Sequence, residues 1–306
     1  IICTTMNTSF SSLATRTWKL ISTQPKMSGI VFLYQFIPTL VFFALALCAI
    51  FCTAFVMPRM GIDFSNPNTL EALIVRFANP VSIVLGLVGW LIVILAFLLF
   101  QLTCSYLARL GLAHIAQKKK FNFSSLLREW RGMWSWAGTG LATSVYFITT
   151  FIVTAVLAVV CIYIYDMLVI LPVILWGAIF VFLGISLAFT FPIYFFESKR
   201  YFAATEGSRK MVRGRWWKTL GNFVLLGLAI MLVSMIIFGL ESGAQYTLSF
   251  LPDSLFDSMF ITAIFAIGAF VSMILQSAIN IIIQLFAILY TFELYRDYDK
   301  TPVTKK

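Results

Sequence analysis

Six long stretches of the chain are almost continuously apolar and contain no Asp, Glu, Lys or Arg. A charged side chain at the centre of a bilayer costs about 2.5 to 3.5 kcal/mol on insertion scales, and a spanning helix needs about 20 apolar residues. The stretches show no strand-like alternation of apolar and polar residues, so we expect helices, which hydrogen-bond all their backbone groups internally in lipid. The pattern therefore predicts an all-α integral membrane protein, one polytopic domain over residues 1–306, with spans at approximately 30–57, 80–107, 138–164, 168–195, 219–240 and 260–291.

The positive charges divide the connecting segments into two classes. Of the 22 Lys and Arg residues, all but Arg59 and Arg76 fall on one side of the predicted six-span zigzag. Cytoplasmic loops of membrane proteins carry an excess of Lys and Arg. We therefore expect the basic side, with both termini, to face the cytoplasm, and the protein to reside in the cytoplasmic (inner) membrane.

An internal repeat joins the spans into three helical hairpins, each preceded by a basic, Trp-containing amphipathic segment. We call these the lead-in segments. Ser9-Phe10-Ser11-Ser12-Leu13 before Trp18 is similar to Asn122-Phe123-Ser124-Ser125-Leu126 before Trp130, and the third lead-in, Tyr201 to Trp217, matches more loosely. Residues 109–131 and 197–218 are the expected cytoplasmic basic interfacial segments.

The second lead-in has the pattern of a short amphipathic helix, with Ser124 as N-cap and Leu126, Leu127, Trp130 and Met133 on one face. Such a helix lies in the headgroup layer with its cations toward lipid phosphates. The alternative is an ordinary loop with the generic charges of a cytoplasmic segment. The residues expected to contact anionic lipid headgroups are Arg128, Trp130, Arg131, Trp134, Arg213, Arg215, Trp216 and Trp217.

One polar stripe lies inside a span. Ser272, Gln276, Asn280 and Gln284 follow one another at four-residue spacing on the last predicted helix, and Gln101 on the second span is a natural partner. The stripe either lines a polar path or joins helices by hydrogen bonds worth about 0.6 kcal/mol each.

The amino-acid composition excludes several classes of protein. With 61% hydrophobic and 11% charged residues, the chain is not a soluble domain, which keeps about 25% charged residues. The net charge of +10 reflects the membrane topology, so we expect no nucleic-acid partner. The single histidine and five scattered cysteines offer no metal-ligand spacing, and we predict neither a metal nor another cofactor.

Two stretches resemble a known family. They are Ala203-Ala204-Thr205-Glu206-Gly207-Ser208-Arg209-Lys210-Met211-Val212-Arg213-Gly214-Arg215-Trp216-Trp217-Lys218-Thr219-Leu220-Gly221 and Leu289-Tyr290-Thr291-Phe292-Glu293-Leu294-Tyr295-Arg296-Asp297. Both are similar to the YciC-like prokaryotic six-span membrane proteins and to the membrane domain attached to some glycerophosphodiester phosphodiesterases. The resemblance implies an architecture and no activity, because that family is mostly of unknown function. His114 alone cannot supply the catalytic cluster of the phosphodiesterases.

The predicted spans hold no ionisable Asp, Glu, Lys or Arg, which argues against a proton relay. We therefore expect a non-enzymatic accessory, scaffold or assembly subunit of a membrane complex, with anionic lipid and protein partners. The first alternative is a carrier or channel for a lipid or small amphipathic solute along the polar stripe. The second is an intramembrane lipid enzyme that uses Glu197 and Glu293.

Overall fold

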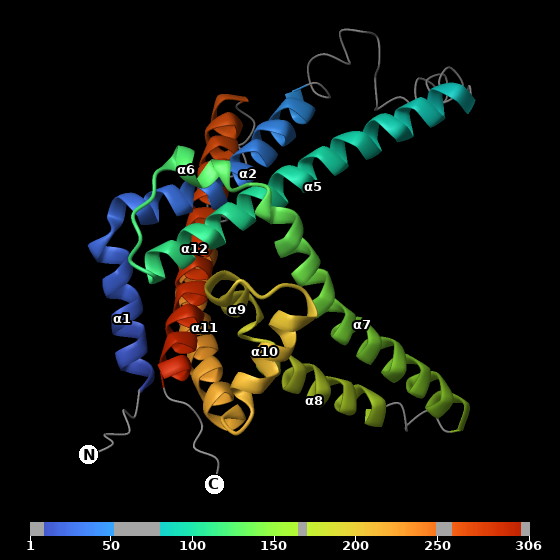
Figure 1. Ribbon diagram of the computed structural model, residues 1–306. Helices are drawn as coiled ribbons and strands as arrows, with labels where there is room; N and C mark the ends of the chain where they lie inside the picture. The colour runs from blue at the N-terminus through green and yellow to red at the C-terminus, as the bar shows by residue number, and fades with distance from the viewer. Residues whose placement is uncertain (1–8, 52–79, 165–169, 249–258, 301–306) are drawn as a thin grey trace. The chain divides into compact units, whose positions relative to one another are not determined.

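The computed structural model describes residues 9–51, 80–164, 170–248 and 259–300, and every regular element in these ranges is a helix (Figure 1). The helices are α1 (Phe10–Thr23), α2 (Pro25–Phe51), α5 (Pro80–Ala116), α6 (Phe123–Arg128), α7 (Gly132–Ile164), α8 (Ile170–Ser186), α9 (Thr190–Glu197), α10 (Phe202–Val212), α11 (Trp216–Leu248) and α12 (Met259–Lys300).

Six segments of the described chain are long and apolar enough to cross a membrane. This finding confirms the predicted all-α, six-span fold, and the protein is a multi-pass membrane protein. The side that faces the cytoplasm stays a prediction. The six segments are Pro25–Cys48, Val88–Ala116, Gly132–Ile162, Ile170–Glu197, Trp216–Gly239 and Phe270–Lys300.

Helices α5 and α12 extend well beyond the predicted spans. The second span ends at residue 107 by hydropathy, whereas α5 continues to Ala116. Hydropathy ends the predicted span before Arg109 because this residue is charged. In the structure the Arg109 guanidinium lies 5.0 Å from the ring centroids of both Trp136 and Phe191, and these cation–π contacts stabilise the charge within the protein. The first residues of segment 109–131 therefore belong to a span helix. The last span, which hydropathy ends at residue 291, continues likewise to Lys300.

The fourth span, predicted as one helix over 168–195, is divided into α8 and α9. Pro192 lies in the first turn of α9, where its missing N–H leaves no hydrogen bond unmade. At this break, the buried Ser208 hydroxyl of α10 provides partners for two backbone groups. It accepts from the Phe189 N–H at 3.0 Å and donates to the Ser186 carbonyl at 2.8 Å.

The chain divides into two compact units, which we describe separately. Unit 2 comprises Leu33–Ser105 and holds most of α2 and the first part of α5, with the rings of Phe42 and Phe97 6.3 Å apart. Unit 1 comprises Ile1–Phe32 and Tyr106–Lys306 and holds all the lead-in helices. The candidate sites below belong to unit 1.

The returning helices of the three hairpins meet within unit 1 at the end of α5, at α9 and at the end of α12. We call this assembly, together with the lead-in helices α1, α6 and α10, the basic core. Three contacts join the returning helices in pairs: Tyr106 stacks on Phe195 at 6.2 Å, Phe196 stacks on Tyr295 at 5.2 Å, and Arg296 Nη1 donates to the Ala116 carbonyl at 2.7 Å.

The predicted repeat is visible as three equivalent helix starts. Each lead-in helix begins with a phenylalanine, and the fourth helical residue is fully buried and donates its N–H to the carbonyl of the residue before the helix. The first residues are Phe10, Phe123 and Phe202, and the donor–acceptor pairs are Leu13 to Ser9, Leu126 to Asn122 and Thr205 to Tyr201, at 3.2, 3.1 and 3.4 Å.

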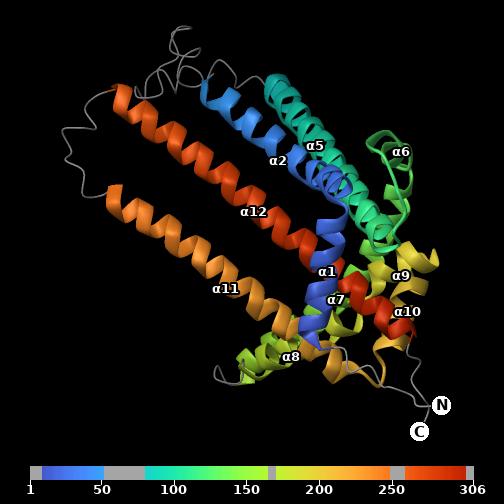
Figure 2. The ribbon, with the colours of Figure 1, turned by 90° about the vertical axis from the view of Figure 1, so that its left-hand side faces the viewer.

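Each lead-in helix packs on the returning helix of the preceding hairpin. Helix α10 contacts α9, and Leu126 of α6 lies so close to Gly111 of α5 that an added Cβ would stand 3.4 Å from its methyl carbon. Helix α1 closes the cycle by packing on the end of α12 (Figure 2). At this contact Arg16 and Asp297 form an ion pair of 2.9 Å. The order of packing therefore forms a ring.

Candidate functional site

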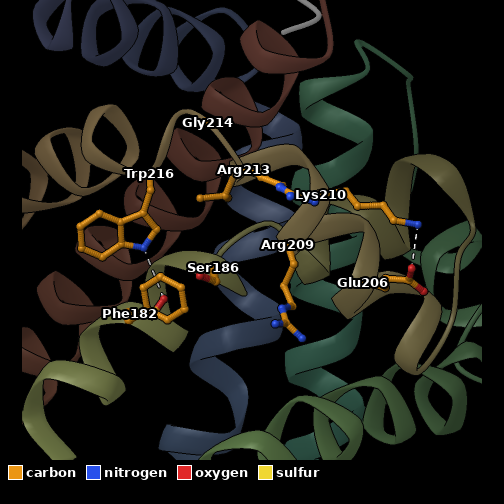
Figure 3. Close-up of a pocket in the computed structure, with 9 residues that line it drawn as sticks. Phe182, Ser186, Glu206, Arg209, Lys210, Arg213, Gly214 and Trp216 are labelled. Carbon is orange, nitrogen blue, oxygen red and sulfur yellow. Dashed lines mark hydrogen bonds and ion pairs between the residues drawn. The ribbon is translucent and has the colours of Figure 1, made fainter. Parts of the chain in front are cut away.

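A cavity of about 500 Å³ lies where α8, α10 and the start of α11 come together. Figure 3 shows an aromatic pair at one side, an ion pair at the other, and two arginines between them. We call it the α10 pocket. The lining residues are Phe182, Ser186, Glu206, Arg209, Lys210, Val212, Arg213, Gly214 and Trp216.

The turn between α10 and α11 forms the rim of the α10 pocket. Arg213 has φ −56° and ψ 123°, Gly214 has φ 84°, and the Arg215 N–H donates to the Val212 carbonyl at 2.8 Å. These values define a type II β-turn, whose third position needs a positive φ and therefore favours glycine. The turn leaves the Arg213 side chain exposed at the pocket rim.

The apolar wall consists of Phe182 from α8 and Trp216 from α11. Their rings stack with centroids 5.8 Å apart and an interplanar angle of 26°. The Trp216 indole N–H also reaches the Phe182 carbonyl at 3.5 Å, a long hydrogen bond that orients the ring. An indole fixed in this way presents an apolar face beside a charged rim, as tryptophans do at membrane interfaces.

The cationic side chains of the pocket differ in how far they are neutralised. Lys210 forms an ion pair of 2.7 Å with Glu206, and the hydrogen bond from Lys210 lowers the pKa of that carboxyl group. Arg209 lies 5.8 Å from the ring centroid of Tyr146. The Arg213 guanidinium has no hydrogen-bond or ion-pair partner within the part of the chain that the structure describes. Its guanidinium is therefore available to an anion.

An amphiphile fits this combination of groups. A phosphate can accept two parallel hydrogen bonds from a guanidinium, and hydrocarbon can lie against Phe182 and Trp216. Exposed cations near a membrane surface attract anionic lipids by about 1 kcal/mol each. The α10 pocket has the chemistry of a site for the headgroup and upper chain region of an anionic lipid.

The pocket brings together two of the predicted headgroup residues, Arg213 and Trp216. Trp217 is 78% exposed and packs edge-on against Trp216 at 4.9 Å. Arg215 points elsewhere, because its Nη1 donates to the Tyr298 carbonyl at 3.0 Å and its guanidinium lies over the Tyr298 ring. Arg215 therefore joins the turn to α12.

Sequence reasoning missed the remaining pocket residues. The four-residue spacing of Arg209 and Arg213 just before a predicted span is a signal that could have found the basic side of the pocket. Phe182 carries no local signal, since it reaches the site through the packing of α8 on α11.

The second lead-in differs from the predicted amphipathic helix. The predicted Ser124 N-cap is wrong, because α6 begins at Phe123 with Asn122 as its N-cap. Leu126 and Met133 are buried in the protein, whereas Leu127 and Trp130 are exposed, so the four do not share one face. The helix is too short for the predicted periodicity. Three other predicted headgroup residues of this segment, Arg128, Arg131 and Trp134, are exposed.

The predicted polar stripe lies on α12 as expected from its spacing. The side chains of Ser272, Asn280 and Gln284 are exposed, and Gln276 is partly buried and has an interaction partner. No residue described in unit 1 covers the three exposed members. Gln101 belongs to unit 2 and is exposed there, so its pairing with the stripe stays a prediction.

The two carboxylates of the enzyme hypothesis have structural partners. Glu197 accepts a hydrogen bond of 2.7 Å from the Tyr295 hydroxyl and pairs with Lys199. Glu293, 6% exposed, accepts from Arg296 at 2.9 Å. Among the residues that the structure describes, no three His, Cys, Asp or Glu side chains could hold a metal ion together.

Comparison with known proteins identifies no relative of this chain. No protein-family model matches the chain, and no curated protein or solved structure is significantly similar to it. The resemblance to the YciC-like family therefore stays a prediction.

Proposed function

We propose that this protein is a non-enzymatic subunit of a membrane complex that binds anionic phospholipids through its basic core, with the α10 pocket as the principal lipid site. The basic core and both termini face the cytoplasm, and the protein resides in the cytoplasmic membrane. The proposal includes membership of the YciC-like family. The observation that carries the proposal is the unpaired Arg213 guanidinium beside the stacked Phe182 and Trp216 rings.

The structure supports a binding role over a chemical one in two ways. Glu197 and Glu293, the carboxylates of the enzyme hypothesis, are held by ion pairs within the fold. The α10 pocket offers cations and aromatic rings, which suit the recognition of an anionic amphiphile. Lipid held at this site would position the surrounding helices for contact with a protein partner.

The test is lipid retention by a variant that lacks both pocket arginines. Arg209→Gln with Arg213→Gln removes two cations of about 1 kcal/mol each, so affinity for phosphatidylglycerol should fall by about tenfold to thirtyfold. Native mass spectrometry of protein released from nanodiscs of phosphatidylcholine and phosphatidylglycerol measures the bound lipid. Lys119→Gln with Lys120→Gln removes the same charge outside the pocket and should retain wild-type binding.

Equal loss in the two double variants would refute the α10 pocket as a lipid site and leave only the general attraction of a basic surface. Loss of binding in the pocket variant alone, with unchanged helical circular dichroism, supports the proposal. Co-purification of a stoichiometric partner after mild detergent extraction tests the subunit role, and a homogeneous lone species would count against it.

The proposed orientation has its own test. Topology reporters fused at Asp166 and Lys306 should report opposite sides of the membrane, with the reporter at Lys306 in the cytoplasm. Two reporters on one side would exclude the six-span topology.

A second candidate function is a carrier or channel for a lipid or small amphipathic solute. The observation that favours it is the exposure of Ser272, Asn280 and Gln284 within a membrane-spanning segment. Leucine at Gln276, Asn280 and Gln284 distinguishes the two functions. Loss of lipid transfer between vesicles with unchanged thermal stability supports the carrier, whereas loss of stability indicates that the stripe holds helices together.

A further inference from the structure

A second hollow, of about 370 Å³, lies in the basic core where α1 crosses the end of α12. It shares no residue with the α10 pocket, and it includes a residue from the turn after α5. We call it the α1–α12 groove. Its lining residues are Arg16, Lys19, Leu20, Thr23, Lys118, Glu293, Arg296, Asp297 and Lys300.

Both carboxylates of the groove are already neutralised. Arg16 donates to the two oxygens of Asp297 at 2.9 Å each, and Arg296 donates to Glu293 at 2.9 Å. The hydrogen bond that Arg16 donates to Asp297 raises the pKa of the Arg16 guanidinium. The groove therefore holds five cationic side chains against two acidic ones, and each acidic group has its own arginine.

Three lysines remain without a counter-charge. Lys19 belongs to α1, Lys118 to the turn after α5, and Lys300 to the end of α12. None has an ion-pair or side-chain hydrogen-bond partner among the residues of the described ranges. Three ammonium groups from separate elements thus line one groove, and both carboxylates of the groove are already paired with arginines.

The position of Lys118 is informative because the backbone there favours glycine. Helix α5 ends in a Schellman motif, with the Lys119 N–H on the His114 carbonyl at 2.9 Å and the Lys118 N–H on the Ile115 carbonyl at 3.0 Å. Lys118 occupies the left-handed position, with φ 56°, where a side chain is strained and glycine is preferred. From this strained backbone position the Lys118 side chain lines the groove.

We propose that the α1–α12 groove binds a phosphate group through Lys19, Lys118 and Lys300. Lysine ammonium groups bind phosphate as point charges, and three of them provide for the charge of a phosphate monoester or a phospholipid headgroup. The ligand contacts α1, the end of α5 and the end of α12 at once, so it ties the first lead-in helix to two returning helices. This site is separate from the lipid site of the proposed function.

The experiment uses the full chain in dodecyl maltoside, with inorganic phosphate titrated against chloride at constant ionic strength. Tryptophan fluorescence during heating reports the stabilisation, and phosphorus NMR line broadening reports binding directly. Lys19→Gln, Lys118→Gln and Lys300→Gln together should weaken phosphate binding by about tenfold, each exposed charge contributing a modest factor. The matched control, Lys26→Gln with Lys119→Gln and Lys120→Gln, removes the same charge outside the groove and should bind as the wild type does.

A lipid arm separates the two sources of phosphate. If the groove binds a lipid headgroup, the triple groove variant releases phosphatidylglycerol from nanodiscs and the control does not, while free phosphate has no effect on either. If it binds a soluble phosphate compound, the phosphate response changes and lipid retention does not. Identical behaviour of groove and control variants in both arms overturns the proposal.

Two further variants keep the result interpretable. Lys118→Gly removes one ammonium and relieves the left-handed strain, so the protein should become more stable and yet bind phosphate more weakly. If Lys118→Gly binds phosphate and lipid as the wild type does, the lysine has no ligand role and the proposal fails. Arg209→Gln with Arg213→Gln should leave the groove intact, and an equal loss of phosphate binding in this variant would also overturn the proposal.

Discussion

The break between α8 and α9 depends on one hydroxyl group, and its removal is a stringent test of the fold. Ser208 is completely buried, and its hydroxyl accepts from the Phe189 N–H and donates to the Ser186 carbonyl. Ser208→Ala leaves both backbone groups buried without a partner. Each unsatisfied group costs about 1 to 3 kcal/mol, so the variant should lose about 2 to 6 kcal/mol of unfolding free energy.

The assay is equilibrium unfolding in mixed detergent micelles, followed by tryptophan fluorescence. The matched control is Ser277→Ala, because that hydroxyl makes an exposed hydrogen bond only within its own helix, to the Met273 carbonyl at 2.8 Å. The control should change stability by less than about 0.5 kcal/mol.

The same substitution should loosen the α10 pocket, since Ser186 lines it and Ser208 joins Ser186 to α10. We expect lipid retention to fall together with stability in Ser208→Ala. A variant within about 0.5 kcal/mol of the wild type would refute the reasoning, because the break would then have other hydrogen-bond partners.

Three further substitutions test local features of the basic core by the same unfolding assay. Gly214→Ala places a Cβ at a positive φ and should cost about 1 kcal/mol, with weaker lipid retention. A double-mutant cycle of Arg16→Gln and Asp297→Asn should give a coupling of about 0.5 to 1 kcal/mol, because the arginine side chain is 42% exposed. Leu126→Ala should cost about 2 to 5 kcal/mol and Leu127→Ala less than about 0.5 kcal/mol; equal costs would contradict the observed orientation of α6.

The spans could be predicted because charge is costly in lipid, and the described chain has six segments able to cross a membrane at the predicted places. The ends of those helices could not be predicted on the same ground. Hydropathy treats Arg109 as the end of a span, while stacking on Trp136 and Phe191 keeps it inside a helix. Tertiary contacts of this kind cannot be predicted from the local amino-acid composition.

The candidate site was accessible to prediction only in part. Arg213 and Trp216 stand out in sequence because a cation and an indole next to a span indicate a membrane interface. Phe182 belongs to a different hairpin, and its stacking on Trp216 depends on how α8 and α11 pack. The repeat was a better guide, since the Phe10 and Phe123 motifs both begin helices with a buried fourth residue.

The ring of lead-in helices has a consequence for biosynthesis. Arg16 and Asp297 are 281 residues apart, so α1 leaves the ribosome long before the helix on which it docks. At about 5 to 20 residues per second, α1 waits about 15 to 60 s for its partner. During that interval the Leu13 side chain lacks its final contacts and is a target for chaperones or proteases. We expect chains truncated before α12 to leave α1 undocked, and limited proteolysis of such chains should cleave α1 sooner than in the full chain.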